Sequence, residues 1–377
     1  MSLISVLSGP ALVMAPMTKG GNLPYRRLCQ AFGATVTMSE MAVVRSLQHR
    51  RKGEFALIQR APDERCFGVQ LAGRSPDELR WGAALVASRG ADFVDLNLGC
   101  PIDEFTRRGL GSALLRQPRR IERLVAAMKD GAGPVPVTVK IRLGWNEDER
   151  NAVDVARAAE AGGADALTVH GRTRSARYRN AADWVAIREV AEAVRIPVVG
   201  NGDILFPEDI ERGRALSGVQ AVMIARGALI KPWIFAEALG QVVDDSPEAR
   251  VAIYREYVRL AKEHFGDDER GHTRLRPFLV WHLGLWCRHI PRQPDGSYVP
   301  MQERAVFASP GTPLEGLLAR REPEVHGWIA DRLMAGDELL PDELPADIVP
   351  DRPADARDRG DRGDRRDRHA VDTPAAG

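Results

Sequence analysis

The sequence contains little cysteine. Only four of its 377 residues are cysteines, at Cys29, Cys66, Cys100 and Cys287. None of them forms a CxxC pair, and no Cys/His cluster has the spacing of a zinc site, so we expect neither a disulfide framework nor a metal site. Few and widely separated thiols are typical of a reducing cytosol, so we predict a cytoplasmic protein.

Long apolar runs are missing as well. No stretch approaches the ~20 apolar residues that a membrane-spanning helix requires. The first ten residues also lack the basic start of a signal peptide. We therefore expect no association with a membrane.

The net charge is only +1, but the charge is unevenly distributed. From Asp337 onward there are 12 acidic and 7 basic residues, which leaves 46 basic and 40 acidic residues in the first 336. A moderately basic body can bind an anionic polymer, although many ordinary enzymes have a similar excess. Residues 337–377 are rich in Pro, Asp, Arg, Ala and Gly, and we predict that they form a disordered charged tail.

Eight short apolar runs predict parallel β-strands. They lie at residues 11–15, 34–38, 66–71, 92–96, 136–142, 165–169, 196–200 and 219–224. Helical stretches separate several of them, and buried parallel strands joined by helices form a closed barrel or a doubly wound sheet. The count of eight favours a (β/α)8 TIM barrel over residues 1–240. Helical periodicity in 252–265 and 274–290 predicts a smaller all-helical domain over 245–336.

The residues that follow each strand should form the active site, because β/α barrels carry theirs at the C-terminal ends of the strands. After the last two strands come Asn201-Gly202-Asp203 and Ala225-Arg226-Gly227. Glycines let a phosphate approach backbone N–H groups, and Arg226 can add an ionic contact, so these loops predict a phosphate site. The alternative is that the glycines only make tight turns.

Lysine is rare, with 6 lysines against 47 arginines, which makes Lys140 at the end of a buried strand notable. Its compact ammonium suits the negative charge of a reduced flavin; the alternative is an ion pair in the barrel mouth. Gln70 could bind another polar edge of the same ring. Cys100 lies in a rim loop between Gly99 and Pro101, where a thiol could act as nucleophile or proton donor.

Several motifs resemble those of the tRNA-dihydrouridine synthases. They include APMTKGGNLPYRRLC (15–29), DLNLGCP (95–101), VHGRTR (169–174), GNGDI (200–204) and ARGALIKPW (225–233). They follow the family's order over almost the whole predicted barrel. The later WHLGLWCRHIP stretch is closest to the eukaryotic-type branch that modifies the tRNA variable loop.

The resemblance implies an enzyme that reduces a uridine of tRNA at C5=C6, with FMN as cofactor and NADPH as reductant. Cys100 would be the general acid, which requires a thiol that stays protonated near neutral pH. The residues implied to contact FMN are Pro16, Met17, Thr18, Gln70, Lys140 and His170, with Asn201, Gly202, Asp203, Ala225 and Arg226 at its phosphate end. Those implied to face the uracil are Asn97, Arg142 and Arg172.

A tRNA substrate would have its target base extruded into the pocket and its backbone gripped by the helical domain. Arginines that lie near Trp281 and Trp286 suit such contacts, although tryptophans at helical spacing could instead be core residues. These arginines are Arg270, Arg274, Arg276, Arg288 and Arg292. We expect a monomer.

Two alternatives remain open. The first is another FMN-dependent barrel reductase that acts on a small molecule, similar to dihydroorotate dehydrogenase or an enone reductase; it would not need a basic helical domain. The second is a non-catalytic RNA-binding protein on a relic barrel, which the intact set of Lys140, His170, Asn201 and Arg226 disfavours.

Overall fold

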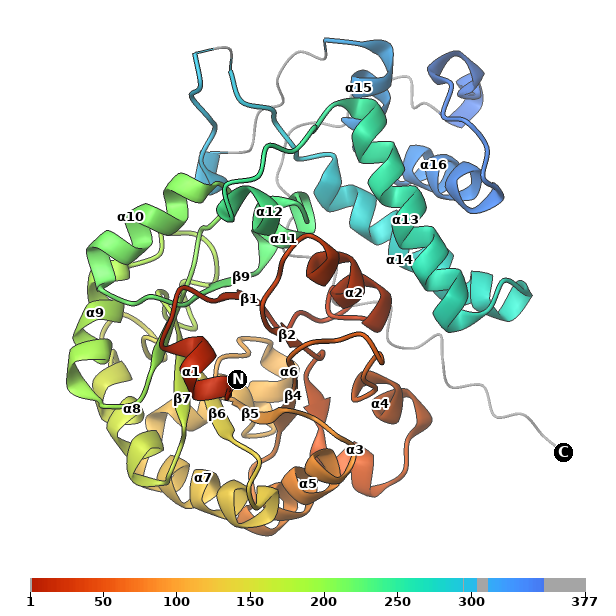
Figure 1. Cartoon of the computed structure of the whole chain (residues 1–377). Coiled ribbons are helices and arrows are strands. Elements are labelled where there is room, and N and C mark those ends of the chain that lie inside the picture. Colours follow the sequence, from red (N-terminus) through yellow and green to blue (C-terminus); the bar gives the residue numbers. More distant parts are fainter. Residues whose placement is uncertain (1, 294, 304–310, 349–377) are drawn as a thin grey trace, which may run out of the picture.

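The computed structural model describes residues 2–293, 295–303 and 311–348, and it contains a parallel β-barrel ringed by helices (Figure 1). The barrel strands are β1 (Leu12–Met14), β2 (Thr37–Met38), β4 (Phe67–Ala72), β5 (Phe93–Asn97), β6 (Val137–Arg142), β7 (Ala166–His170), β8 (Val198–Asn201) and β9 (Val222–Ile224). All eight predicted strands are present, so the predicted (β/α)8 TIM barrel is confirmed.

The strands are parallel and follow the order β1-β9-β8-β7-β6-β5-β4-β2. An isolated parallel bridge between Val13 and Val36 joins the two ends of this path and closes the barrel. One further strand, β3 (Ala42–Val43), pairs with the end of β4 and was not predicted. It is only two residues long and carries no strand signal of its own.

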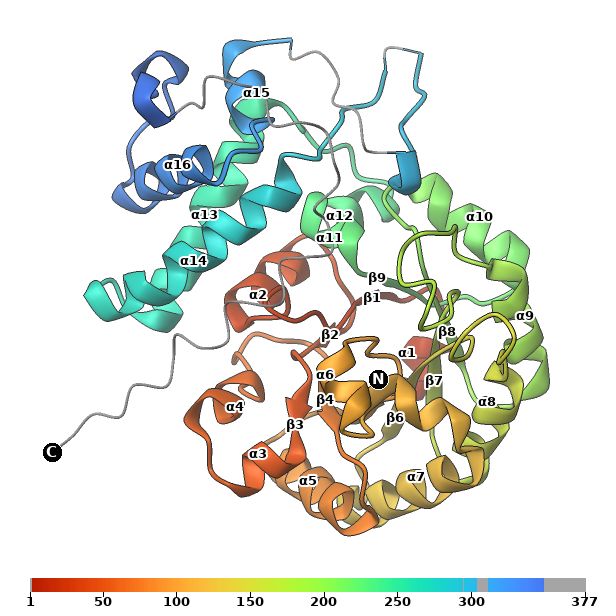
Figure 2. The same ribbon diagram turned by 180° about the vertical axis from the view of Figure 1, so that it is seen from behind.

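Helices surround the barrel and short ones cover its ends (Figures 1 and 2). The outer helices are α2 (Leu23–Ala31), α3 (Val44–Gln48), α4 (Lys52–Leu57), α5 (Pro76–Ser88), α7 (Pro118–Ala132), α8 (Ala152–Ala161), α9 (Trp184–Ala193) and α10 (Pro207–Ser217). The helix α1 (Leu3–Leu7) closes the N-terminal end, because Leu3 and Leu7 pack on the inward-facing side chains of Val13 and Phe93. The opposite end is thereby left as the open mouth.

Two short helices lie in the loop after β5, α6 (Asp103–Arg107) and η1 (Gly111–Arg116). Two more follow β9, α11 (Arg226–Ile230) and α12 (Ile234–Ala238). These insertions lie at the C-terminal ends of their strands, where the mouth of the barrel is located.

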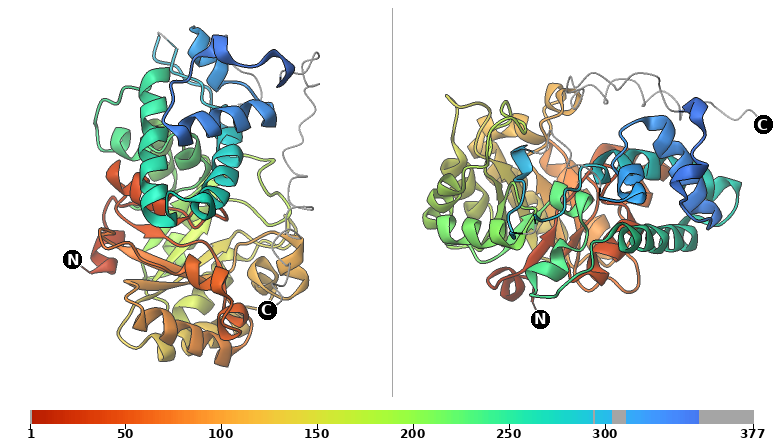
Figure 3. Two further views of the ribbon diagram at one scale, coloured as in Figure 1. Left: turned by 90° about the vertical axis from the view of Figure 1, so that its right-hand side faces the viewer. Right: turned by 90° about the horizontal axis from the view of Figure 1, so that it is seen from above.

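A group of helices packs beside the barrel (Figure 3). It consists of α13 (Pro247–Phe265), α14 (Glu269–Trp286), α15 (Pro313–Leu318) and α16 (Pro323–Ala335). The helix predicted at 274–290 begins earlier, because Asp268 caps it at Gly271 N, and it ends at Trp286. Trp286 is buried against Tyr254 and Trp233, so the core interpretation is correct for this tryptophan.

The helix α14 is tied to the open end of the barrel through Tyr25. The Tyr25 hydroxyl donates to Ala228 O in α11 at 2.7 Å and lies 3.1 Å from Nε2 of His282 in α14. His282 also lies 3.1 Å from the Tyr254 hydroxyl of α13. These buried hydrogen bonds fix α11, which follows the last barrel strand, against the helices beside the barrel.

The predicted disordered tail begins with ordered structure. Residues 341–343 and 346–348 form the 3-10 turns η3 (Pro341–Glu343) and η4 (Ala346–Ile348), and Leu339 is buried in the main core. The boundary at Asp337 is therefore corrected, since the apolar burial of Leu339 orders the chain beyond it. The rest of the predicted tail, residues 349–377, lies outside the described residues. Within the described part of the chain, no helix is long and apolar enough to span a membrane.

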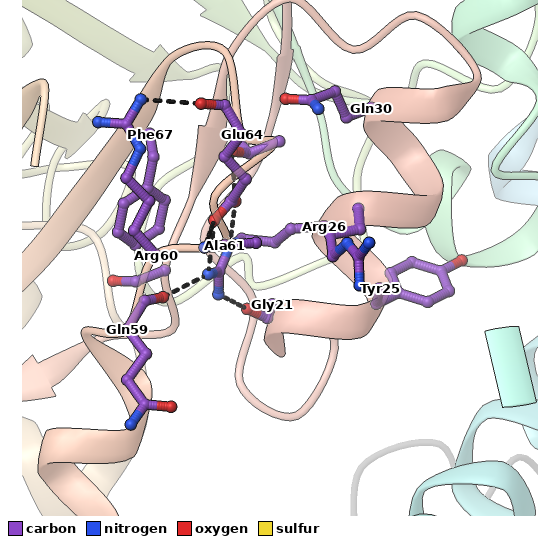
Figure 4. Close-up of polar contacts among 12 residues, drawn as sticks. Gly21, Tyr25, Arg26, Gln30, Gln59, Arg60, Ala61, Glu64 and Phe67 are labelled. Carbon is purple, nitrogen blue, oxygen red and sulfur yellow. Dashed lines mark hydrogen bonds and ion pairs between the residues drawn. The ribbon is translucent and has the colours of Figure 1, made fainter. Parts of the chain in front are cut away.

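A buried ion pair fixes the loop between β1 and α2 (Figure 4). Arg26 donates from Nε to Oε1 of Glu64 at 2.7 Å, and both side chains are almost fully buried. The Arg26 guanidinium also donates to Gly21 O and Gln59 O and stacks over the ring of Phe67. Because every polar partner is satisfied, this pair can hold the loop that begins at Pro16 in place.

Candidate active site

Three polar side chains lie at one level inside the barrel, on neighbouring strands. Strand register aligns Gln70 with Asp95 and Asp95 with Thr138. Asp95 accepts hydrogen bonds from Gln70 Nε2 at 2.7 Å and from the Thr138 hydroxyl at 2.6 Å. Gln70 Oε1 in turn accepts from Asn97 Nδ2 at 2.6 Å. The predicted residues Gln70 and Asn97 are thus bonded directly to each other, and Gln70 is also bonded to a carboxylate that the sequence analysis did not single out.

The loop that carries Cys100 is held from three sides. Asn97 Oδ1 accepts from the backbone N–H groups of Gly99 at 3.2 Å and Cys100 at 2.9 Å. The Ser112 hydroxyl donates to Cys100 O, and Arg142 Nε donates to Gly99 O. Cys100 itself is half-buried. Its backbone is therefore well fixed at the mouth, as a proton donor requires.

Lys140 lies at the end of β6, half-buried, and donates from Nζ to Asn201 Oδ1 at 3.1 Å. Desolvation, and secondly the positive charge of Arg142, lower the pKa of Lys140 to about 7, while Asp95 opposes the shift. The geometry does not support the ion-pair alternative, because Nζ of Lys140 is hydrogen-bonded to the neutral amide of Asn201. A positive charge that lacks a bonded counter-ion suits an anionic ligand.

His170 is buried at the end of β7 and is surrounded by cations. Burial lowers the pKa of His170 well below its usual value, and the charges of Arg142, Lys140, Arg172 and Arg226 lower it further. His170 is therefore a neutral imidazole. Its ring contacts the position of Gly202, because a Cβ added there would lie 3.5 Å from His170 Cδ2.

Asp203 joins two arginines at the mouth. It accepts from Arg172 Nη2 in a short ion pair and from Arg226 Nη2 at 3.1 Å, and these arginines lower its pKa against the effect of burial. Gln302, from the segment between α14 and α15, donates to the same carboxylate at 2.8 Å. Because a carboxylate repels phosphate, only the backbone of Asp203 could contact a phosphate directly.

The glycines after the last two strands allow very close approaches. Gly202 has φ +143°, and a Cβ there would lie 2.4 Å from that of Ala182. A Cβ on Gly227 would lie 2.0 Å from the carbonyl oxygen of Ile204. Gly227 therefore packs the loop after β9 against the loop after β8, and Gly202 packs against the loop after β7, so neither position leaves room for a side chain.

The remaining predicted residues also lie at the open end. Pro16 and Met17 are half-buried and Thr18 is exposed, directly after β1, where Gly21 N donates to Met17 O. Ala225 directly follows β9 and is half-buried. Both arginines predicted to face the uracil are buried. Arg142 donates hydrogen bonds to the carbonyls of Gly99, Thr173 and Arg177. Arg172 donates one to the carbonyl of Asn180.

Tyr178 was missed by the sequence analysis. It is half exposed, and the guanidinium of Arg226 stacks on its ring at 4.3 Å. The ring also lies near His170 and Arg142. The only available signal was an aromatic residue in the arginine-rich loop after β7. An exposed aromatic ring beside a cationic pocket can stack on a planar ligand.

The mouth therefore has an excess of positive charge. In the described part of the chain, Lys140, Arg142, Arg172 and Arg226 lie beside the carboxylates of Asp95 and Asp203. A bound dianion such as a phosphate monoester would balance them, so the residues fit the phosphate and anionic ring of a reduced flavin nucleotide. Among the described residues, no group of three or more metal-binding side chains occurs.

The arginines predicted to grip RNA are partly engaged within the protein. Arg276 pairs with Asp331 and Arg292 pairs with Glu208. Arg274 lies over the ring of Phe265 at 6.0 Å. Arg270, by contrast, is exposed at the start of α14. Arg107 and Arg108 lie at the end of α6 and are exposed.

Comparison with known proteins gives consistent results. The model of the dihydrouridine synthase family matches residues 13–278. The chain is 38% identical to a tRNA-dihydrouridine(47) synthase [NAD(P)(+)] of Coprinopsis cinerea over 84% of this chain and 49% of that protein. It is 40% identical to the enzyme of that name from Cryptococcus neoformans, over 74% and 41%. For the human protein named tRNA-dihydrouridine(47) synthase [NAD(P)(+)]-like, the identity is 42% over 74% and 43%. The chain thus spans about half the length of these relatives.

Proposed function

The chain belongs to the dihydrouridine synthase family, and we propose that it reduces the C5=C6 bond of a uridine in transfer RNA, at position 47 of the variable loop. The proposal includes FMN as bound cofactor and NADPH as reductant. The observation that carries it is the 38–42% identity to relatives named for this reaction, together with the match of the family model to residues 13–278, which include the residues of the mouth.

The residues at the mouth suit the binding of FMN. The chemistry that FMN would supply here, when bound and reduced, is the hydride that C6 of the uracil ring accepts. Lys140 would bind the ring through Nζ, where the negative charge of the reduced flavin would favour the protonated ammonium. Gln70 has one N–H and one lone pair left for the ring after its bonds to Asp95 and Asn97. Arg226 and the backbone of Gly202, Asp203 and Ala225 hold the phosphate end.

Cys100 donates the proton to C5 of the uracil. Its backbone is fixed by Asn97 and Ser112, so the thiol is presented to the mouth from a rigid loop. Proton donation requires the thiol form, and the surrounding arginines must therefore not convert it fully to thiolate. His170, neutral and bonded to Arg172, orients that arginine and is not the acid.

The target uridine must leave its stack in folded RNA to reach this pocket. The excess of cations at the mouth draws the phosphate backbone toward it, and the exposed ring of Tyr178 offers a surface for stacking. The names of the relatives favour tRNA over the small-molecule substrate of the alternative reductase.

The function is tested by mass spectrometry of tRNA from a strain in which the gene is deleted. We expect one uridine at position 47 to lack the mass of two hydrogens, and the gene in trans to restore it. A tRNA pool with every dihydrouridine retained would overturn the proposal.

A further inference from the structure

Asp95 is a buried carboxylate that the proposed mechanism does not use, although it is bonded to a polar residue of the site. Asp95 is 1% exposed at the centre of β5. It is bonded on one side to Gln70 of β4 and on the other to Thr138 of β6. Lys140 of β6 is the charged group that faces it. Because a buried carboxylate is costly, its place at the floor of the pocket requires a reason.

The donors and acceptors beyond Asp95 form a chain with a fixed direction. An ionised carboxylate can only accept, so Gln70 must turn its amide nitrogen toward Asp95 and its oxygen toward Asn97. Asn97 must then turn its nitrogen toward Gln70 at 2.6 Å, which leaves its oxygen for the N–H of Cys100 at 2.9 Å. The two amides could each turn either way, and their orientation is fixed from both ends, by Asp95 at one end and by the N–H groups of Gly99 and Cys100 at the other.

We propose that Asp95 is a positioning residue that fixes the orientation of the Gln70 and Asn97 amides and thereby the backbone of Cys100. It touches neither substrate nor cofactor. The inference rests on the proposed function in so far as Cys100 is the proton donor, but the orientation itself is a property of the protein alone.

Replacing Asp95 by asparagine tests the direction of the hydrogen bonds without changing the packing of the side chain. The Asp95→Asn side chain has the same shape, but its amide can donate to Gln70 as well as accept from it. The Gln70 and Asn97 amides can then reverse, and the Cys100 N–H faces a donor in place of an acceptor. Thr138→Val is the matched control, because it removes the other hydrogen bond of Asp95 and leaves the carboxylate as an obligatory acceptor.

The test is residue-resolved hydrogen exchange of the apoprotein. We expect the amides of Gly99 and Cys100 to exchange roughly fivefold faster in Asp95→Asn, the effect of losing one hydrogen bond. Thr138→Val should leave them within about twofold of wild type. The amide of Leu98 is an internal reference, because it donates to Lys140 O. Unchanged exchange in Asp95→Asn, or an equal rise in both variants, would overturn the proposal.

A second variant guards against misfolding of the first. Gln70→Met breaks the chain one residue later, and its apoprotein should show the same faster exchange at Gly99 and Cys100. If Asp95→Asn does not fold, unchanged exchange in Gln70→Met refutes the chain. The melting temperature of each variant identifies misfolding.

The rate of tRNA reduction distinguishes a failure of this inference from a failure of the proposed function. In the FMN-loaded enzyme, Asp95→Asn should reduce tRNA with a kcat roughly tenfold lower and a similar KM. If wild type fails to reduce tRNA, the proposed function fails, whereas the exchange result still decides the orientation. Equal tRNA turnover in wild type and Asp95→Asn would refute the role of Asp95 in placing Cys100.

Discussion

Nη1 of Arg172 lies 3.2 Å from Nε2 of His170. A guanidinium can only donate, so Nε2 must accept, and His170 is neutral with its proton on Nδ1. We predict that His170 keeps this form near neutral pH, because burial and four neighbouring cations lower its pKa. The ¹⁵N chemical shifts of the imidazole ring measure the protonation state and the tautomer of His170 directly.

Substitution of Arg172 by methionine should raise the pKa of His170, since it removes one of those cations. Arg174→Met, in the same loop but paired with Asp103, should leave it unchanged. Titration of wild-type His170 near its ordinary value, or a proton on Nε2, would contradict the assignment.

Lys140 should make the stability of the apoprotein depend on pH. Its pKa is lowered to about 7 in the folded protein, against roughly 10.4 in an unfolded chain. Between these values the unfolded state binds more protons, so the free energy of unfolding rises with pH, by at most about 1.4 kcal/mol per pH unit. Denaturation at pH 6, 8 and 9.5 should show this rise in wild type and in the exposed control Lys52→Met. It should be absent in Lys140→Met; an equal rise there assigns it to another group.

Gly227→Ala should disrupt the phosphate loops. The added Cβ would meet the carbonyl oxygen of Ile204 at 2.0 Å, so α11 and the loop after β8 must separate. We expect a loss of about 1–3 kcal/mol of stability and an FMN affinity weaker by roughly tenfold or more. Gly53→Ala is the control, because that helical glycine has open space around it. Tight FMN binding by Gly227→Ala, measured by flavin fluorescence, would argue against these loops as the phosphate site.

Arg26→Met should be strongly destabilising because it leaves Glu64 buried without its partner (Figure 4). The expected loss is about 3–5 kcal/mol. The neighbouring Arg27 forms ion pairs with the exposed Asp63 and Glu263, so Arg27→Met should cost no more than about 1 kcal/mol. Urea denaturation compares them. Equal losses in the two variants would show that burial of the Arg26 pair has no special role.

The barrel was predictable because each strand is a short apolar run between helices, and Val198 or Val222 needs no tertiary information to be assigned to one. The two-residue strand β3 was not, since its residues pair with β4 only because the closed barrel brings them there. The first turn of α14 was missed because its capping residue, Asp268, lies among other polar residues.

The site was predictable where a residue of a chemically informative type lies at or just after the end of a predicted strand, as Lys140 and Cys100 do. What was missed depends on contacts across the fold. Asp95 is one polar residue inside an apolar strand, and its role follows only from its neighbours on β4 and β6. Gln302 reaches Asp203 over 99 positions in the sequence, which no local pattern indicates.

The most direct test is a single turnover with purified protein. FMN-loaded enzyme is reduced by NADPH without oxygen and mixed with a tRNA transcript that carries an unmodified U47. Wild type should reoxidise its flavin and add the mass of two hydrogens at that uridine. The Cys100→Ala variant should keep its flavin and its reduction by NADPH, but reduce tRNA at least roughly 100-fold more slowly, while Cys66→Ala behaves as wild type. A tRNA of unchanged mass with wild type, or equal rates with and without the Cys100 thiol, would contradict the account.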